Sequence, residues 1–238
     1  MHNLHHDPSR QSPDLQSPDL QSPDLQSPDS LNQALQNSPP DIDKRALRRF
    51  LRRQRQALSK REQRDAAKRL CHRLQTLPEI TRARRLSLYL PVNGEIDPTP
   101  LLPWLRKRGV AIYLPVLCPF SANRLWFVAY HPNTPMVKNR FGIWEPDSRF
   151  SAQRRNRLPA WALDTLIVPL VGFDNQANRM GMGGGFYDRS LAFMRRPGPS
   201  PTLIGVAHAC QRVAALPVEP WDVPLKVVVS DQDCVRRQ

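Results

Sequence analysis

The stretch Asn178-Arg-Met-Gly-Met-Gly-Gly-Gly-Phe-Tyr-Asp-Arg189 holds four of the ten glycines of the chain, all within five residues. It follows an apolar strand predicted at 164–170 and a turn at 172–175, and it precedes a helix predicted at 186–194. Glycine permits positive φ angles and lets successive backbone N–H groups close around an anion. Ligands of α/β sheets bind beyond the carboxyl ends of the strands, where helix N-termini favour phosphate. The pattern predicts a phosphate-binding loop, with a turn that binds no ligand as the alternative.

This loop differs from the two best-known glycine motifs for nucleotides. A Walker A loop would end in Gly-Lys-Ser or Gly-Lys-Thr, and a dinucleotide fingerprint would open at the first strand–helix turn. The flanking residues add to the prediction, because Arg179 and Arg189 bracket the loop and can pair with phosphate oxygens. Asp188 could hold Mg²⁺ through its carboxylate or could favour the start of the helix, and the sequence leaves both roles open.

Short apolar strands alternate with helices along the rest of the chain. A first helix is indicated by an apolar stripe at Ile42, Leu47, Phe50, Leu51 and Leu58. A second opens with a Ser59-Lys-Arg-Glu62 capping box. A third helix is predicted at 98–107, and 131–160 is predicted to be irregular. The predicted strands are 86–90, 110–115, 125–130, 164–170, 202–207 and 225–229. This order predicts a largely parallel α/β sheet covered by helices on both faces.

Residues 11–30 repeat a five-residue unit, Gln-Ser-Pro-Asp-Leu three times and then Gln-Ser-Pro-Asp-Ser. Proline in every repeat blocks a helix, and one Leu per repeat cannot build a core. Residues 1–40 are therefore predicted to be a disordered tail, and residues 41–238 a single domain that carries the functional site. A start codon assigned too early is the rival explanation for the repeat.

Charge is divided unevenly between these two parts. Residues 1–43 carry seven Asp and one Arg, a net −6, whereas 44–238 carry 34 basic and 14 acidic residues, a net +20. A body this basic can bind nucleic acid, concentrate a polyanionic small substrate in a cleft, or present a solvated basic surface on the outer faces of its helices. Nucleic-acid binding calls for aromatic side chains among the basic ones, and 44–74 contain only Phe50. We therefore expect small anionic substrates and no nucleic acid.

The cysteines and the apolar runs bear on location. The four cysteines, Cys71, Cys118, Cys210 and Cys234, form no CxxC pair and show no metal-ligand spacing, so reduced thiols are expected. No run of about 18 apolar residues suggests a membrane span, and no secretory signal is recognisable. A cytoplasmic protein is expected, and a monomer.

The glycine stretch resembles the signature of the 5-formyltetrahydrofolate cyclo-ligase family, also called 5,10-methenyltetrahydrofolate synthetases, whose usual form is Arg-Leu-Gly-x-Gly-x-Gly-(Tyr/Phe)-Tyr-Asp. Three other segments agree with the family in order. Lys44-Arg-Ala-Leu-Arg48 resembles its basic N-terminal helix, and Leu90-Pro-Val-Asn-Gly-Glu95 resembles the strand end that meets the folate. Phe141-Gly-Ile-Trp-Glu-Pro146 resembles its Gly-Ile-x-Glu-Pro element. The match runs from about Lys44 to Ser230 and leaves the tail without a counterpart.

The resemblance implies a three-layer Rossmann-like (NagB/RpiA-like) fold. It also implies ATP- and Mg²⁺-dependent closure of 5-formyltetrahydrofolate to 5,10-methenyltetrahydrofolate, by phosphorylation of the formyl oxygen and attack of N10, with release of ADP and phosphate. The implied folate-binding residues are Leu90, Glu95 and Phe186. The implied catalytic residues are Arg179 and Tyr187, and Asp188 is the implied Mg²⁺ ligand. The implied ATP-binding residues are Lys44, Arg48, Arg179, Met180, Gly181, Met182, Gly183, Gly184, Gly185, Phe186 and Tyr187.

Some details stay open at this point. Glu95 follows an Asn-Gly turn at a strand end and could grip the N–H donors of a pterin, or it could be an exposed loop carboxylate. Trp126 and Trp144 could flank an aromatic ligand or could contribute only to packing.

One position departs from the family pattern. The family often has a second acidic Mg²⁺ residue in an Asp-x-Pro-(Leu/Met)-Asp stretch, whereas this chain reads Asp222-Val-Pro-Leu-Lys226. A charged Lys cannot ligate Mg²⁺, so the metal is expected to rely on Asp188, ATP oxygens and water, or to recruit Asp222. A further alternative is that the chain is a family member that has lost activity, with Lys226 as the residue that suggests it.

Overall fold

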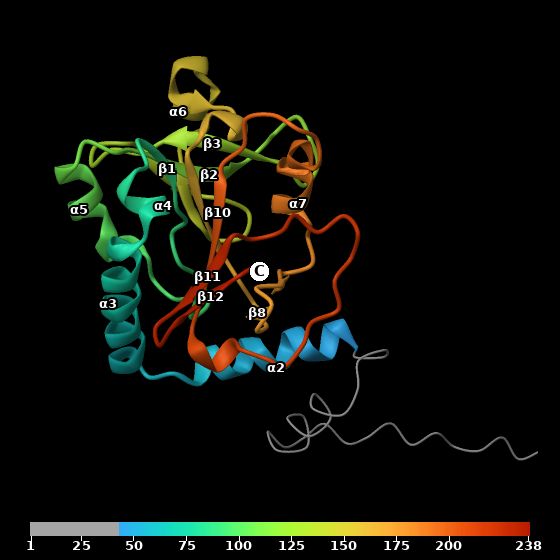
Figure 1. Ribbon diagram of the computed structural model, residues 1–238. Coiled ribbons are helices and arrows are strands. Elements are labelled where there is room, and N and C mark those ends of the chain that lie inside the picture. The colour runs from blue at the N-terminus through green and yellow to red at the C-terminus, as the bar shows by residue number, and fades with distance from the viewer. Residues whose placement is uncertain (1–42) are drawn as a thin grey trace, which may run out of the picture.

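The computed structural model describes residues 43–238, so the predictions for the tail and for Ile42 lie outside the described residues. Its centre is an eight-stranded sheet with the strand order β12-β11-β10-β7-β1-β2-β3-β6, which Figure 1 shows between helices. The five central strands are parallel: β11 (Val227–Ser230), β10 (Thr202–Ala207), β7 (Thr165–Pro169), β1 (Arg85–Ser87) and β2 (Ala111–Leu117). The outer strands pair antiparallel: β12 (Cys234–Arg236), β3 (Leu125–Ala129) and β6 (Arg157–Leu158). The prediction of a largely parallel sheet is confirmed.

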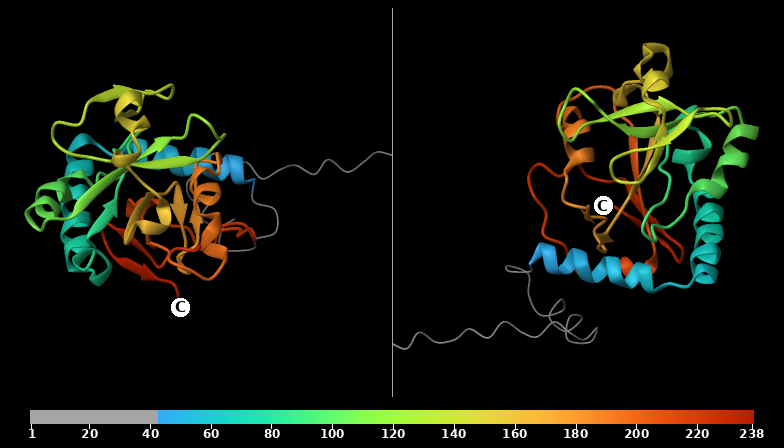
Figure 2. Two further views of the ribbon diagram at one scale, coloured as in Figure 1. Left: turned by 90° about the horizontal axis from the view of Figure 1, so that it is seen from above. Right: turned by 180° about the vertical axis from the view of Figure 1, so that it is seen from behind.

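Alternate residues of the central strands face two separate hydrophobic cores. Ile167 belongs to one core, and its neighbours Leu166 and Val168 belong to the other, because successive side chains of a strand point to opposite faces. The first core is covered by α3 (Lys60–Thr76), α4 (Pro78–Thr81) and α5 (Leu102–Lys107). The second is covered by α7 (Phe186–Ser190) and the 3₁₀ helix η4 (Ala192–Arg195). Figures 1 and 2 show these helices on opposite sides of the sheet, which confirms the predicted layers.

Helix α2 (Lys44–Ala57) crosses the molecule beyond the carboxyl ends of the parallel strands, at the bottom of Figure 1. Its buried residues Leu47 and Leu51 pack in a third core with Val171 and Met180, which follow β7. The helix approaches closely because residue 172 is glycine: a Cβ there would lie 2.5 Å from Leu51 Cδ1. The sequence thus places α2 along the edge of the sheet where ligands of α/β proteins bind.

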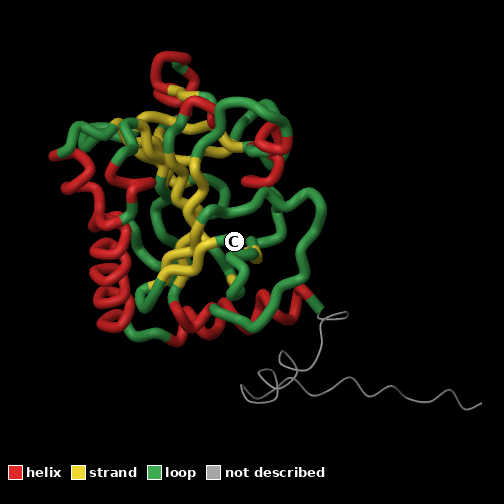
Figure 3. The backbone as a smooth tube through the Cα atoms, in the orientation of Figure 1, coloured by secondary structure: helices red, strands yellow, loops and turns green. Residues whose placement is uncertain are grey.

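Several element boundaries differ from the predictions. The capping box of α3 is present, with both the Ser59 and the Glu62 hydrogen bonds. The predicted helix at 98–107 consists of η1 (Thr99–Leu101) and α5. Strand β1 ends at Ser87 rather than at residue 90, and the helix predicted at 186–194 is broken at Leu191 into α7 and η4. The tubes of Figure 3 show how short these pieces are.

The prediction that 131–160 is irregular was wrong. This segment forms a hairpin of β4 (Met136–Lys138) and β5 (Trp144–Pro146), then α6 (Ser148–Ala152), η2 (Arg154–Asn156) and β6. The sequence also failed to predict β12. Other short elements are η3 (Ala160–Ala162), β8 (Gly172–Phe173), β9 (Arg179–Met180) and η5 (Ala209–Gln211). These pieces of two to five residues are too short for hydrophobic periodicity to identify.

The predictions for the cysteines and for the apolar runs can be compared with the structure. All four cysteines are free thiols, as their spacing predicted. Within residues 43–238, no helix combines the length and the apolar character that a membrane crossing requires.

Candidate functional site

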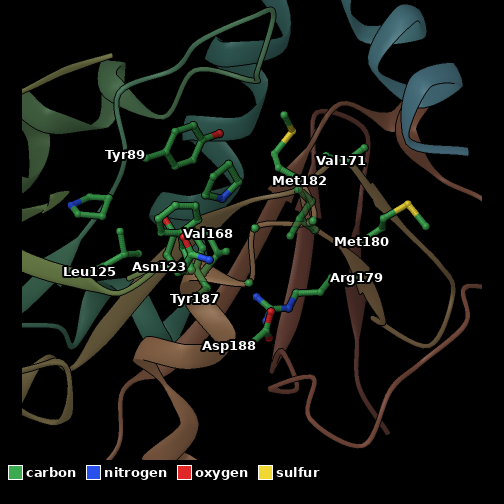
Figure 4. Close-up of a pocket in the computed structure, with 18 of the residues that line it drawn as sticks. Tyr89, Asn123, Leu125, Val168, Val171, Arg179, Met180, Met182, Tyr187 and Asp188 are labelled. Carbon is green, nitrogen blue, oxygen red and sulfur yellow. The ribbon is translucent and has the colours of Figure 1, made fainter. Parts of the chain in front are cut away.

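A cavity of about 1140 Å³ opens at the carboxyl ends of β1, β2 and β7 (Figure 4). Pockets for a single drug-sized ligand span roughly 300–1000 Å³, so this cavity has room for two ligands side by side. The structure brings together all of the residues predicted for the site. The predicted residues that line the cavity are Lys44, Arg48, Leu90, Glu95, Arg179, Met180, Gly181, Met182, Gly183, Gly184, Gly185, Phe186, Tyr187 and Asp188.

The glycine loop, residues 181–185, joins β9 to α7 in the cavity wall. Two of its residues need the freedom of glycine, because Gly183 has φ +93° and Gly185 has φ +63°. Helix α7 has only five residues, so its dipole is small. Attraction for an anion must therefore come chiefly from the N–H groups of the loop and from nearby cations, rather than from the helix end that the sequence suggested.

Two cations of α2, at residues 44 and 48, line the cavity and lie one helical turn apart on the same face. Arg48 Nε donates to the carbonyl oxygen of Gly181 at 2.9 Å. Lys44 forms an ion pair with Glu219, a residue that the sequence analysis did not consider. Part of the charge of α2 therefore lines the cavity, which excludes a solvated basic surface as the full explanation for the charge of this helix.

Arg179 and Asp188 form an ion pair beneath the loop, and Figure 4 shows their side chains pointing toward each other. The Arg179 side chain is only 8% exposed. Asp188 Oδ1 also accepts a hydrogen bond from Val223 N at 3.2 Å. Asp188 makes no side-chain hydrogen bond that caps α7, but it lies in the first turn of that helix, so its position is compatible with both of its predicted roles. Both described contacts of Asp188 fall on Oδ1, so Oδ2 is the oxygen available to a cation.

The donor set of the cavity can be compared with the needs of Mg²⁺. Within residues 43–238, no group of three or more His, Cys, Asp or Glu could hold a metal ion. Mg²⁺ does not require such a group, because it is commonly held by one or two carboxylates, substrate phosphates and water. Asp188 and Asp222 both line the cavity and fit that pattern. Lys226 does not line it; this residue is exposed and lies close enough to Glu79 to lower the pKa of that carboxyl.

Glu95 lines the cavity at the end of the segment that follows β1. Its side chain is 10% exposed, which excludes the alternative of an exposed loop carboxylate. Oε2 accepts a hydrogen bond from Val92 N at 3.1 Å, and Oε1 lies 3.7 Å from Arg55 Nη2. Burial raises the pKa of Glu95, and Arg55 acts against that rise. This end of the cavity therefore offers an acceptor with restricted access to water.

Two tyrosines complete this end of the cavity. The Tyr89 hydroxyl donates to the carbonyl oxygen of Ile96 at 2.5 Å, and Tyr187, the second residue of α7, also lines the cavity (Figure 4). Burial raises the pKa of both hydroxyl groups, and the nearby Glu95 carboxylate adds to the effect. Both therefore stay neutral and can act as hydrogen-bond donors at physiological pH.

The sequence analysis missed several residues of the cavity. The β4–β5 hairpin contributes residues that include Asn139, Phe141 and Trp144, and the segment before β11 contributes Glu219. Phe141 was quoted only as part of a motif, whereas Trp144 was also considered as a residue that could flank an aromatic ligand. Their large exposure, 57% and 51%, places both at the rim. Trp126 lines a separate small pocket under Arg157, so it does not flank a ligand in this cavity. No local sequence motif around Glu219 indicates that this residue belongs to the site.

Comparison with known proteins agrees with the motifs in the sequence. The model of the 5-formyltetrahydrofolate cyclo-ligase family matches residues 41–231. The 5-formyltetrahydrofolate cyclo-ligase of Escherichia coli strain K12 is 43% identical over 181 residues, which cover 76% of this chain and 96% of that protein. The protein of the same name from Haemophilus influenzae is 42% identical, with 75% and 92% covered. The solution structure of Aquifex aeolicus 5,10-methenyltetrahydrofolate synthetase superposes with a TM-score of 0.68 at 30% identity, covering 82% of this chain and 93% of that one.

Proposed function

This chain belongs to the 5-formyltetrahydrofolate cyclo-ligase family and is an enzyme of that class, and from this premise we propose how its cavity performs the reaction. The enzyme uses ATP and Mg²⁺ to close 5-formyltetrahydrofolate to 5,10-methenyltetrahydrofolate, and it releases ADP and phosphate. One observation carries the proposal: the glycine loop with its cations and the nearly buried carboxylate of Glu95 line the same cavity. A polyanion and a pterin can therefore lie side by side in it.

The reaction needs a better leaving group than the oxygen of a formamide. In the first step that oxygen attacks the γ-phosphorus of ATP, the bond to the β-phosphate oxygen breaks, and ADP leaves. In the second step N10 attacks the formyl carbon and loses its proton. The carbon–oxygen bond then breaks, and the oxygen leaves as part of phosphate. The protein's task in such a transfer is to position the reactants and to neutralise charge.

The loop and the cations around it are placed to hold the triphosphate. The N–H groups of 181–185 and the side chains of Lys44 and Arg48 bind its oxygens, and Arg179 stabilises charge on the transferred phosphoryl group. In the described structure Lys44 pairs with Glu219 and Arg179 with Asp188, so ATP must compete for these cations. Mg²⁺, held by Asp188 with Asp222 nearby, would offset the remaining phosphate charge.

The other half of the cavity is placed to hold the reduced folate. Glu95 accepts hydrogen bonds from the N–H groups of the pterin, and Leu90 and Phe186 supply apolar contact. Tyr187 lies between the two halves and stays neutral, because burial raises the pKa of its hydroxyl. It can donate a hydrogen bond at the point where the formyl oxygen meets the γ-phosphate. No covalent nucleophile is required.

A continuous spectrophotometric assay tests the function directly. Purified full-length protein is expected to form the methenyl product from 5-formyltetrahydrofolate only when ATP and Mg²⁺ are both present. Omission of ATP, or addition of EDTA, should abolish product formation, and ADP should appear in a 1:1 ratio with the product. Circular dichroism shows that the protein is folded. Absence of turnover in folded protein, or turnover without ATP, would contradict the proposal.

Removal of residues 1–40 is expected to leave the catalytic constants within about twofold of the full-length values. The family match begins at residue 41, and every described residue that lines the cavity lies at position 44 or beyond. Steady-state kinetics for both substrates checks this expectation. A truncation that starts at residue 49 is the matched comparison, because it also removes Lys44 and Arg48 and should raise the KM for ATP. A large loss of activity from the shorter truncation would show that the tail contributes to the enzyme.

A further inference from the structure

One face of α2 carries three cations along the edge of the cavity. Residues 44, 48, 51 and 55 follow one another at intervals of four, three and four, which places them on the same side of a helix. Lys44 and Arg48 line the cavity, whereas Arg55 lies about 16 Å from Lys44 and about 10 Å from Arg48 along the helix axis, at a rise of about 1.5 Å per residue. Its side chain is only 1% exposed. The sequence analysis assigned no role to Arg55, and the structure buries it.

Arg55 is directed at the turn that presents Glu95. Its Nε donates to the carbonyl oxygen of Asn93 at 3.1 Å, and Nη2 lies 3.7 Å from Glu95 Oε1. Its Nη1 donates to the carbonyl oxygen of Leu170 at 3.4 Å, at the end of β7. The guanidinium group therefore links α2, the turn after β1 and the end of β7. Two of these contacts reach the turn and one reaches the end of β7, so together they specify the place of the turn closely.

The same turn is held from two further directions. His208 Nε2 lies 3.2 Å from the carbonyl oxygen of Gly94, a distance at which the Nε2–H tautomer donates. Gly94 has φ +74°, and a Cβ there would lie 3.2 Å from the carbonyl oxygen of Arg55. The turn is thus pressed against the backbone of α2 and can hold this position only with glycine. These contacts fix the backbone of the two residues that precede Glu95.

A buried guanidinium is expensive to desolvate, and a structure keeps one where its partners compensate for that cost. Here Nη2 has no hydrogen-bond partner within the described residues, and the Glu95 carboxylate is its ion-pair partner. Replacement of Arg55 would leave Glu95 buried beside no close cation. A carboxylate in that position would take up a proton more readily and would lose its ability to accept two hydrogen bonds.

We propose that Arg55 is a positioning residue of the reduced-folate site, which holds the turn at 93–95 in place and keeps Glu95 ionised. This inference rests on the proposed function, in which Glu95 accepts hydrogen bonds from the pterin. Arg55 itself does not line the cavity, so it acts on the substrate only through Glu95 and the turn. The chemistry implied for the ligand is a pair of adjacent N–H donors, as a pterin ring offers.

The charged and titratable groups around Glu95 define its response to pH. Arg55 and Arg52 face it from α2, Tyr89 from the end of β1, and Tyr187 from α7. Among the charged groups only the two arginines favour the carboxylate, with Arg55 having the larger effect, and the hydrogen bond from Val92 N acts in the same direction. Because the pKa of Glu95 is already raised by burial, removal of Arg55 should raise it further. On acidification, a variant without Arg55 should therefore lose folate binding at a higher pH than the unaltered enzyme does.

The test is a double-substitution cycle with Arg55→Gln, Glu95→Gln and the combined variant. Arg55→Gln is expected to raise the KM for 5-formyltetrahydrofolate about tenfold, the effect of losing a hydrogen-bonded charge, with little change in the KM for ATP. Its kcat/KM for the folate should partly recover as the pH is raised from 6 to 9. In the Glu95→Gln background, the same change should cause little further loss and should bring no recovery with pH. Arg53→Gln is the matched control, since Arg53 is exposed on the opposite face of α2.

Each outcome of this test decides the inference. Equal losses from Arg55→Gln in the two backgrounds, or equal effects on both substrates, would show a general structural role and overturn it. Thermal melting identifies a variant that does not fold. If Arg55→Gln does not fold, Arg55→Lys replaces it in the cycle, because lysine keeps the positive charge but lacks the planar guanidinium group. If the unaltered protein fails to turn over, the proposed function fails. If that protein is active and Arg55→Gln keeps its KM for the folate, only the role of Arg55 is wrong.

Discussion

Asp188→Asn is expected to lower kcat by about 100- to 1000-fold, the range typical for loss of one preorganised polar group at a reacting centre. The change removes a negative charge from the cavity and leaves the nearly buried Arg179 without its ion-pair partner. It also removes a hard oxygen ligand, because a carboxamide binds Mg²⁺ more weakly than a carboxylate. The Mg²⁺ concentration for half-maximal rate should therefore rise. Initial rates measured across a Mg²⁺ titration at saturating ATP and folate provide both quantities.

Asp233→Asn is the matched control for this experiment. Asp233 also forms an ion pair with an arginine, Arg212, but neither residue lines the cavity. Loss of that pair should leave the Mg²⁺ dependence unchanged, because an ion pair near the surface contributes at most about 1 kcal/mol. If Asp188→Asn lowers the rate without changing the Mg²⁺ dependence, Asp188 acts only by orienting Arg179. If neither quantity changes, Asp188 has no part in the reaction.

The central strands of the fold could be predicted because they are buried on both faces. β7, β10 and β11 read as Thr-Leu-Ile-Val-Pro, Thr-Leu-Ile-Gly-Val-Ala and Val-Val-Val-Ser, nearly continuous apolar runs of the kind that parallel strands require. The edge strand β12 and the β4–β5 hairpin carry polar and charged residues, and each strand has three residues. Their existence depends on pairing with a neighbour that is already in place, which local sequence does not encode.

The glycine loop could be predicted because a local concentration of glycine has few structural explanations. The partners of its charged neighbours could not. Lys44 and Glu219 lie 175 positions apart, and only the completed fold brings them together. The orientation of the Arg55 side chain could not be predicted for another reason. Helical periodicity shows that it shares a face with Leu51, but cationic side chains on such a face usually extend to solvent.

The three-dimensional position of Lys226 also bears on the predicted metal site. In the sequence it occupies the place of a metal-binding acid, which suggested a weakened or lost metal site. In the structure it lies outside the cavity, whereas Asp222, four residues earlier, lines it. The side chain of Asp222 accepts a hydrogen bond from Glu219 N at 2.9 Å, which orders the segment beside Lys44. The charge of Lys226 therefore gives no reason to expect an inactive enzyme.

Gly183→Ala is expected to lower kcat/KM for ATP about 10- to 100-fold, because a strained backbone position costs on the order of 1–3 kcal/mol and every 1.4 kcal/mol is a factor of ten. Gly183 has φ +93°, a conformation that alanine avoids. Its added Cβ would lie 3.6 Å from the guanidinium carbon of Arg48, an ordinary contact. The cost therefore arises from the backbone, which should relax by turning the loop N–H groups away from the phosphates. The KM for the folate should stay nearly constant.

Gly181→Ala supplies the comparison that separates loop geometry from the mere loss of a glycine. A Cβ at Gly181 would meet nothing within 4 Å, and its φ is not positive, so alanine keeps both its N–H and the carbonyl that accepts from Arg48. We expect ATP kinetics within about twofold of the unaltered enzyme, the range for a surface change of ±0.5 kcal/mol. Steady-state kinetics with each substrate varied in turn, together with melting temperatures, distinguishes the two variants. Similar effects of the two changes would mean that the positive φ of Gly183 is not what shapes the loop for phosphate.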